Sequence, residues 1–243
     1  MKLIIEKDYQ NLSKRAAKII IDEMTENPEI TLGLATGSTP LGLYKELIQA
    51  NKSGLIDFSQ VKTFNLDEYI GLDGNHPSSY RYFMDNELFK HINIKLENTH
   101  VPNGRAKDME DYCQEYDKFI EHSGGIDIQI LGIGTNGHIA FVEPGEELSL
   151  GTSVRRLRET TIRDNSRFFN SIEEVPKTAI TVGIKTILKA KKLILLANGE
   201  NKREIMDKFL HSKHITTQIP ASLLHLHQDL TVIIDEEAYG GIK

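Results

Sequence analysis

Residues 35–40 could bind an anion. They read Ala-Thr-Gly-Ser-Thr-Pro, so Thr36, Gly37, Ser38 and Thr39 offer backbone N–H and hydroxyl donors just before a helical pattern. The N-terminus of a helix favours negative charge and suits phosphate groups. The spacing matches neither the glycine-rich dinucleotide fingerprint nor the Walker pattern. From the residues alone, this segment is either a phosphate-binding loop or an ordinary Gly-Ser-Thr-Pro turn.

Two adjacent acids, Asp67 and Glu68, follow the apolar run Val61–Asn65. A carboxyl group at the end of a strand can act as a general acid or base. Acids at such positions also serve as solvated or helix-capping residues. The pattern therefore predicts either a proton-transfer group or a structural one, and the residues alone leave both open.

A glycine-rich segment at residues 132–145 contains the histidine best placed for proton transfer. His138 has Asn136 two residues before it and Glu143 five residues after it. A histidine with a polar partner can move a proton near neutral pH. The chain has no tight His-x-x-x-His or cysteine-rich pattern, so we predict no metal at this site.

All three segments follow predicted strands, and the strands alternate with helical patterns along the chain. The alternation favours an α/β protein with an open parallel sheet and helices on both faces. Ligands of such sheets bind beyond the carboxyl ends of the strands. The predicted strands are Leu3–Glu6, Ile30–Leu34, Val61–Asn65, Ile126–Gly132, Ile180–Val182, Lys192–Ala197 and Leu230–Asp235. The main predicted helices begin after Asp8 and at Pro40, Ser78, Asp108, Asn201 and Ala221.

The 243 residues fit a single α/β domain spanning residues 1–243. Within it, residues 145–175 are polar, weakly periodic and rich in arginine, which is typical of a binding element that covers a site. We call residues 145–175 the lid segment. Its arginines are Arg155, Arg156, Arg158, Arg163 and Arg167.

The bulk composition excludes several classes of function. A formal net charge of -6 is unfavourable for nucleic-acid binding. No apolar run approaches the roughly 20 residues of a membrane span. The single cysteine, Cys113, cannot form an internal disulfide and is expected to pack in a helix. We therefore predict a cytoplasmic protein with no nucleic-acid or membrane partner.

Four segments together resemble the glucosamine-6-phosphate deaminase family, in its order and spacing and over nearly the whole chain. They are residues 32–40, 64–69 and 132–141 and the Asn-Ser-Arg-Phe-Phe run at 165–169. The resemblance implies a three-layer Rossmann-like fold and a hydrolase- or isomerase-type enzyme. Such an enzyme would convert glucosamine 6-phosphate to fructose 6-phosphate and ammonia, without a cofactor.

The resemblance also implies a role for each matched residue. Asp67 would move a proton between carbons 2 and 1, and His138 would open the sugar ring. Asn136 and Glu143 would orient His138. The phosphate of the small-molecule substrate would bind among Thr36, Gly37, Ser38 and Thr39, with Arg167 and Lys202 closing on it.

The chain departs from the family's pattern at a few positions. Asn136 stands where many members have aspartate, and the missing charge favours a neutral His138. Val142 stands where asparagine is common, which removes one polar contact. Glu146 and Ser153 occupy positions that bind an acetylated sugar phosphate in activated members. We therefore expect no such activation, and a monomer or loose homo-oligomer.

Three other functions fit parts of the pattern. A 6-phosphogluconolactonase shares the fold and a similar histidine loop, but Asp67-Glu68 and the context of Arg167 favour the deaminase. A galactosamine-6-phosphate deaminase differs by one epimeric hydroxyl. A sugar-phosphate sensor would usually carry a helix-turn-helix, whereas this sequence begins directly with the α/β pattern.

Overall fold

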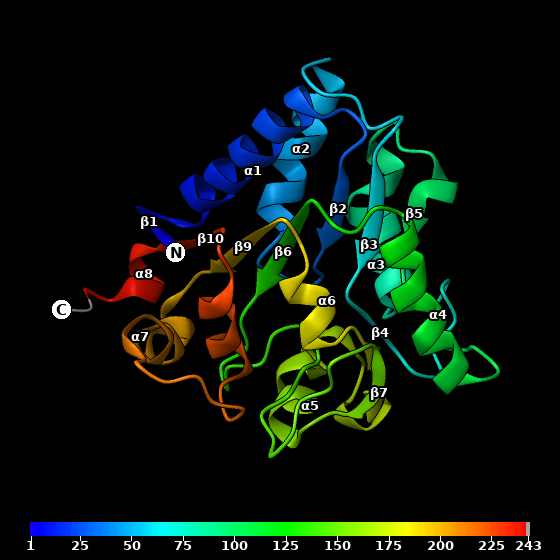
Figure 1. Ribbon diagram of the computed structural model, residues 1–243, viewed down its shortest axis with the longest axis vertical. Coiled ribbons are helices and arrows are strands. Elements are labelled where there is room, and N and C mark those ends of the chain that lie inside the picture. The colour runs from blue at the N-terminus through cyan, green and yellow to red at the C-terminus, as the bar shows by residue number, and fades with distance from the viewer. Residues whose placement is uncertain (242–243) are drawn as a thin grey trace.

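The computed structural model describes residues 1–241, which form a seven-stranded parallel sheet with helices on both of its faces (Figure 1). The predicted α/β class with an open parallel sheet is confirmed. The strand order is β1-β10-β9-β6-β2-β3-β5. The bounds are β1 Lys2–Glu6, β2 Thr31–Leu34, β3 Lys62–Asn65, β5 Thr99–His100, β6 Ile128–Gly132, β9 Lys192–Ala197 and β10 Leu230–Asp235.

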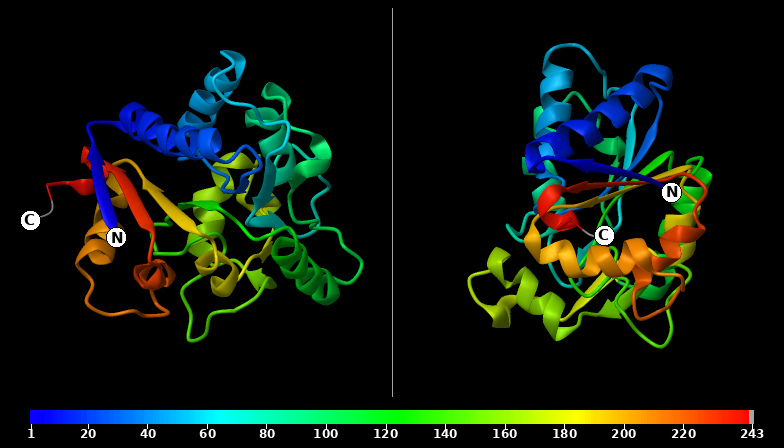
Figure 2. Two further views of the ribbon diagram at one scale, coloured as in Figure 1. Left: turned by 45° about the horizontal axis from the view of Figure 1, so that its top comes forward. Right: turned by 90° about the vertical axis from the view of Figure 1, so that its left-hand side faces the viewer.

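The central strands are buried on both sides, which explains their nearly unbroken apolar sequences. Figure 2 shows α1 and α2 on one face of the sheet and α6 and α7 on the other. The helices are α1 Tyr9–Glu26, α2 Leu41–Lys52, α3 Tyr80–Glu87, α4 Met109–His122, α5 Glu159–Asn165, α6 Ile184–Leu188, α7 Arg203–His211 and α8 Glu236–Tyr239. Six short 3-10 helices join these elements in the described residues. They are η1 Phe89–His91, η2 Leu96–Asn98, η3 Ser166–Phe168, η4 Ile172–Glu174, η5 Glu200–Lys202 and η6 Pro220–Leu226.

Polar side chains cap two of the predicted helices at the expected residues and a third helix one residue later. The Asp8 carboxylate accepts a hydrogen bond from the Asn11 backbone N–H at the start of α1, and Asp108 caps α4 in the same way. The prediction that Ser78 caps α3 is wrong by one residue. Ser79 caps α3 by accepting from the Tyr82 N–H.

A second, three-stranded antiparallel sheet lies beside the carboxyl edge of the large one, and the sequence pattern does not predict it. Its order is β4-β8-β7, with bounds Asp67–Tyr69, Thr178–Thr181 and Ser153–Arg156. The predicted strand at Ile180–Val182 therefore forms, but outside the parallel sheet. After Asn65 the chain leaves β3 and enters this small sheet at Asp67, so the two adjacent acids lie in β4.

The lid segment contains β7, α5 and two short 3-10 helices, η3 Ser166–Phe168 and η4 Ile172–Glu174. Figure 1 shows it as one bulge below the large sheet. Cys113 is buried in α4, as expected. In the part of the chain described, no helix is both long and apolar enough to cross a membrane.

Candidate active site

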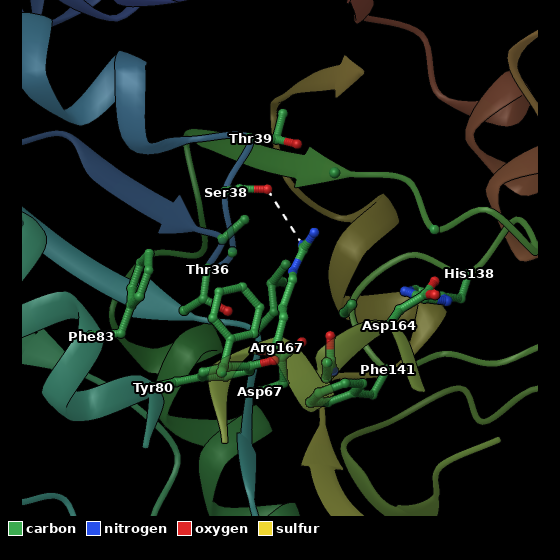
Figure 3. Close-up of a pocket in the computed structure, with 18 of the residues that line it drawn as sticks. Thr36, Ser38, Thr39, Asp67, Tyr80, Phe83, His138, Phe141, Asp164 and Arg167 are labelled. Carbon is green, nitrogen blue, oxygen red and sulfur yellow. Dashed lines mark hydrogen bonds between the residues drawn. The ribbon is translucent and has the colours of Figure 1, made fainter. Parts of the chain in front are cut away.

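A pocket of about 440 Å³ opens at the carboxyl edge of the sheet. β2, β3 and β6 are neighbours in the strand order, so the segments that follow them converge there. The predicted residues that line the pocket are Thr36, Gly37, Ser38, Thr39, Asp67, His138, Arg167 and Lys202. Figure 3 shows Asp67 at the base of the pocket, His138 to one side, and Arg167 crossing it toward Ser38. Asn136 and Glu143 lie behind His138 and do not line the pocket.

The loop at residues 36–39 presents donors toward two cationic side chains. Gly37 has a backbone φ of 91°, a left-handed conformation that favours glycine. The Arg167 guanidinium lies 3.5 Å from the Ser38 hydroxyl. Lys202, half-buried in η5 (Glu200–Lys202), lines the same pocket, and Thr39 donates to the Asn198 side-chain oxygen at 3.0 Å. This arrangement of N–H groups, hydroxyls and two cations suits a phosphate.

The pKa of Lys202 is lowered. The main cause is burial, which disfavours the charged ammonium, and the positive charge of Arg167 lowers it further. The negative charge of Asp164 acts in the opposite direction. A bound phosphate would favour the charged form of Lys202, because an opposite charge close to an ionisable group stabilises its ionised state.

Asp67 and Glu68 are adjacent, yet the structure gives them different surroundings. The Asp67 side chain is only 6% exposed, lines the pocket and has no hydrogen-bond partner among the described residues. Burial raises its pKa from 3.8 to about 8, and the negative charge of Glu68 adds to the shift. A carboxyl group with a pKa near neutrality is well suited to take up and return a proton.

Glu68 instead holds the backbone in place. Its carboxylate accepts backbone N–H groups of Tyr69 at 2.8 Å, Tyr80 at 2.9 Å and Arg81 at 3.0 Å. Tyr80 and Arg81 are the first two residues of α3, so Glu68 ties β4 to the start of that helix. Glu68 thus has the structural role that the sequence left open, whereas Asp67 faces the pocket, and its role in proton transfer stays a prediction.

Replacing Glu68 by Ala should lower the free energy of unfolding by about 2–4 kcal/mol, because three backbone donors would lose a charged acceptor. Glu68→Gln should cost less, since its amide oxygen can keep part of these bonds. Urea unfolding followed by circular dichroism measures the change. An unchanged unfolding midpoint in Glu68→Ala would contradict the assigned role.

His138 is oriented by a chain of hydrogen bonds. The Asn136 side-chain oxygen accepts the His138 backbone N–H at 3.1 Å and lies 2.7 Å from the ring Nδ1. The Asn136 amide donates to Glu143 Oε2 at 3.0 Å. Because the Asn136 oxygen can only accept, Nδ1 carries the proton of the neutral ring and Nε2 is left as the acceptor. The predicted grouping of Asn136, His138 and Glu143 is thus present in space.

A glycine makes the position of this ring possible. A Cβ atom on Gly134 would lie 2.2 Å from the His138 ring, so a side chain there would displace the imidazole. The pKa of His138 is lowered, mainly because burial disfavours the imidazolium, while Glu143 raises it and Lys202 lowers it. The expected neutral His138 agrees with this direction, although burial is the main cause.

Sequence reasoning missed the aromatic wall of the pocket. Tyr80 and Phe141 stack with ring centroids 5.8 Å apart, and Tyr69 packs against both. Tyr69 and Phe141 belong to a small apolar cluster with Leu157 and Ala179, separate from the main core. The positions of Tyr69 and Phe141, shortly after Asp67-Glu68 and His138, were the available signal.

The lid segment contacts the rest of the pocket through polar groups. Asn165 donates to the Tyr69 hydroxyl at 2.9 Å, and Ser78 donates to the Phe168 carbonyl at 3.1 Å. These bonds hold η3 close to α3 and bring Arg167 over the residue 36–39 loop. Within residues 1–241, no group of three or more His, Cys, Asp or Glu side chains is arranged to hold a metal ion.

The fold and the pocket define an α/β protein in which a buried carboxyl group, an imidazole and two cationic side chains line one pocket at the strand ends. The sequence model of the family described as glucosamine-6-phosphate isomerases/6-phosphogluconolactonase matches residues 6–233. The chain belongs to this family.

Three curated relatives named glucosamine-6-phosphate deaminase match this chain over almost their full length. The relative from Clostridium beijerinckii is 55% identical over 243 residues, covering 100% of both chains. That from Thermoanaerobacter sp. (strain X514) is 56% identical and covers 98% of this chain and 94% of its own. That from Clostridium perfringens (strain 13 / Type A) is 53% identical and covers 98% of each.

Solved structures agree with the fold. A structure described as a monomeric glucosamine-6-phosphate deaminase of the NagB superfamily superposes with a TM-score of 0.96 at 44% identity, covering 100% of both chains. The 6-phosphogluconolactonase of Thermotoga maritima has a TM-score of 0.75 at 19% identity, covering 96% of this chain and 98% of its own. The second likeness concerns the fold alone.

Proposed function

We propose that this protein converts glucosamine 6-phosphate and water to fructose 6-phosphate and ammonia. The observation that carries the proposal is that Asp67, His138 and the residue 36–39 loop line a single pocket, with Arg167 reaching Ser38. Relatives 53–56% identical over almost the whole chain carry the name of this activity, which supports the same conclusion.

Phosphate binding fixes the position of the sugar. The phosphate lies among Thr36, Gly37, Ser38 and Thr39, and Arg167 and Lys202 close on it. The planar guanidinium of Arg167 can make two charge-assisted bonds to one phosphate. Because the phosphate is remote from the reacting carbons, its binding energy orients carbons 1 and 2 toward the proton-transfer residues.

His138 opens the ring. Its unprotonated Nε2 accepts the proton of the hydroxyl on carbon 1 and delivers a proton to the ring oxygen, so the bond between carbon 1 and that oxygen breaks. Asn136 keeps the ring in the required tautomer, and Glu143 holds Asn136. The product of this step is the open-chain amino aldehyde.

Asp67 then moves the proton that converts aldose to ketose. As a carboxylate it removes the proton from carbon 2, while the ammonium on that carbon passes one proton to the aldehyde oxygen. The resulting enol-amine then takes the carbon 2 proton back from Asp67 at carbon 1. This leaves a protonated imine at carbon 2. Water adds to that carbon, and the carbinolamine expels ammonia to give the ketone, so the reaction consumes one water for each ammonia released.

Replacing His138 by Gln should slow turnover of glucosamine 6-phosphate by about 10²–10⁴-fold, because one positioned proton transfer is lost. An analogue without the hydroxyl on carbon 5 cannot close the six-membered ring. The substitution should therefore slow the turnover of this analogue far less than that of glucosamine 6-phosphate. Steady-state ammonia release from both compounds measures this contrast. Equal slowing would reject the ring-opening role, and His122→Gln, on the exposed end of α4, is the matched control.

One coupled assay tests the proposed function. Ammonia release is measured in parallel from glucosamine 6-phosphate and its galactosamine epimer, together with the ketose phosphate that each would give, fructose 6-phosphate or tagatose 6-phosphate, and beside hydrolysis of 6-phosphogluconolactone. Release of ammonia with the ketose phosphate supports the deaminase, and the faster epimer is the substrate. Lactone hydrolysis without ammonia release would replace this proposal by a lactonase. The expected monomer or loose homo-oligomer and the cytoplasmic location stay predictions.

A further inference from the structure

Asp164 is a second acidic side chain in the pocket, and it has no role in the proposed reaction. Of the residues that line the pocket, only Asp67 and Asp164 are acidic. Asp164 lies near the end of α5 in the lid segment, and Figure 3 draws it on the same side of the pocket as His138, on which its charge acts. Glu68 and Glu143 do not line the pocket, and both are engaged in hydrogen bonds.

The Asp164 carboxylate is positioned but has room for a further partner. The Thr135 hydroxyl donates to its Oδ2 at 3.2 Å, which links the lid segment to the histidine loop. In the described part of the chain, Asp164 forms no ion pair, and no hydrogen bond reaches Oδ1. Its negative charge opposes the lowering of the pKa that burial causes in both His138 and Lys202, so it acts electrostatically on two residues of the pocket.

The charges of the pocket fit a molecule that carries both signs. Arg167 and Lys202 supply positive charge for a phosphate. Asp67, whose pKa is raised to about 8, is mostly protonated near neutral pH and adds little negative charge there. Asp164 therefore supplies the negative charge of the pocket before the reaction, on the side where His138 acts.

We infer that Asp164 determines specificity by pairing with the protonated amino group on carbon 2 of the substrate. The inference rests on the proposed function, because that function places carbon 1 at His138 and carbon 2 next to it. A carboxylate favours an ammonium over a neutral hydroxyl at the same position, since only the ammonium gains the charge interaction. Asp164 would thus discriminate between amino-sugar phosphates and sugar phosphates of the same shape that carry a hydroxyl on carbon 2.

Two open-chain ligands that cannot react test this role. Glucosaminitol 6-phosphate carries an ammonium on carbon 2, and glucitol 6-phosphate carries a hydroxyl there. Calorimetric titration of the full chain near pH 7 and low salt should show that wild-type protein binds the amino compound about five- to tenfold more tightly. Asp164→Asn should remove most of this preference, because any effect of its charge on Lys202 acts on both phosphorylated ligands alike. Asp164→Glu should retain part of the preference.

The matched control is Glu159→Gln, which removes a negative charge from the exposed first turn of the same helix and should keep the full preference. If Asp164→Asn lowered the affinity for both ligands equally, the inference would be overturned, and Asp164 would only hold the lid segment in place. An unchanged preference would overturn it as well. Wild-type protein that binds neither ligand would reject the proposed function itself, and the inference with it.

Discussion

Asp67→Asn should abolish ammonia release while the protein becomes more stable at neutral pH. The amide cannot accept the proton from carbon 2, so kcat should fall by at least about 10²–10⁴-fold. Phosphate binding should persist, because the residue 36–39 loop, Arg167 and Lys202 are unchanged. Steady-state ammonia release and titration with glucitol 6-phosphate separate the two effects.

The stability effect follows from the raised pKa of Asp67. In the unfolded chain the carboxyl group ionises near its usual value of 3.8, and in the folded protein only near 8. Between these values the unfolded state binds fewer protons, so this group makes folding less favourable as the pH rises, by at most about 1.4 kcal/mol per pH unit. The amide does not titrate. The advantage of Asp67→Asn should therefore grow from pH 5 to pH 8, reaching roughly 2 kcal/mol or more.

The same pKa predicts how activity depends on pH. Because Asp67 must be a carboxylate to accept a proton, kcat/KM of the wild-type protein should rise as the pH increases toward about 8. Asp111→Asn, which makes the same substitution on the exposed first turn of α4, is the control and should alter neither activity nor the pH dependence. A stability difference between Asp67→Asn and wild type that is independent of pH would show that Asp67 is not buried in the uncharged form.

The sequence predicted the pocket because chemistry and topology point to the same edge of the sheet. Residues 36–39, Asp67 and His138 follow strands that the apolar pattern identifies, and β2, β3 and β6 prove to be neighbours. Carboxyl ends of neighbouring parallel strands must converge, so the side chains that follow them meet. The resemblance added Arg167 and Lys202, which no strand pattern would have selected, and both line the pocket.

Other features depend on contacts that no local pattern reveals. Glu68 and Asp67 have the same chemistry in sequence, and only the approach of α3 shows that Glu68 accepts its N-terminal backbone groups. β4 and β7 have three and four residues, too few for a periodic signal, and they are defined by pairing with β8. Ser79 caps α3, while the hydroxyl of Ser78 donates to the lid segment, a contact between residues far apart in the sequence.

Arg167→Ala should raise KM for glucosamine 6-phosphate by about 10- to 100-fold, the loss expected for charge-assisted bonds to a phosphate worth roughly 1.5–3 kcal/mol. Arg167 reaches the Ser38 hydroxyl from the lid segment, so its guanidinium lies where the phosphate would bind. Since phosphate binding also orients the reacting carbons, kcat should fall as well. Arg167→Lys should recover part of the affinity, because a single ammonium keeps the charge but not the planar pair of donors.

The decisive comparison for Arg167 uses a ligand without phosphate. If Arg167 contacts the phosphate, Arg167→Ala should strongly weaken the binding of glucosaminitol 6-phosphate and leave the weak binding of glucosaminitol itself unchanged. Arg163→Ala, on the same lid segment but outside the pocket, should affect neither ligand. Equal weakening of the phosphorylated and unphosphorylated ligands would mean that Arg167 acts on the position of the lid segment. Because the lid segment also carries Asp164, the phosphate site and the amino-group site would then be expected to fail together.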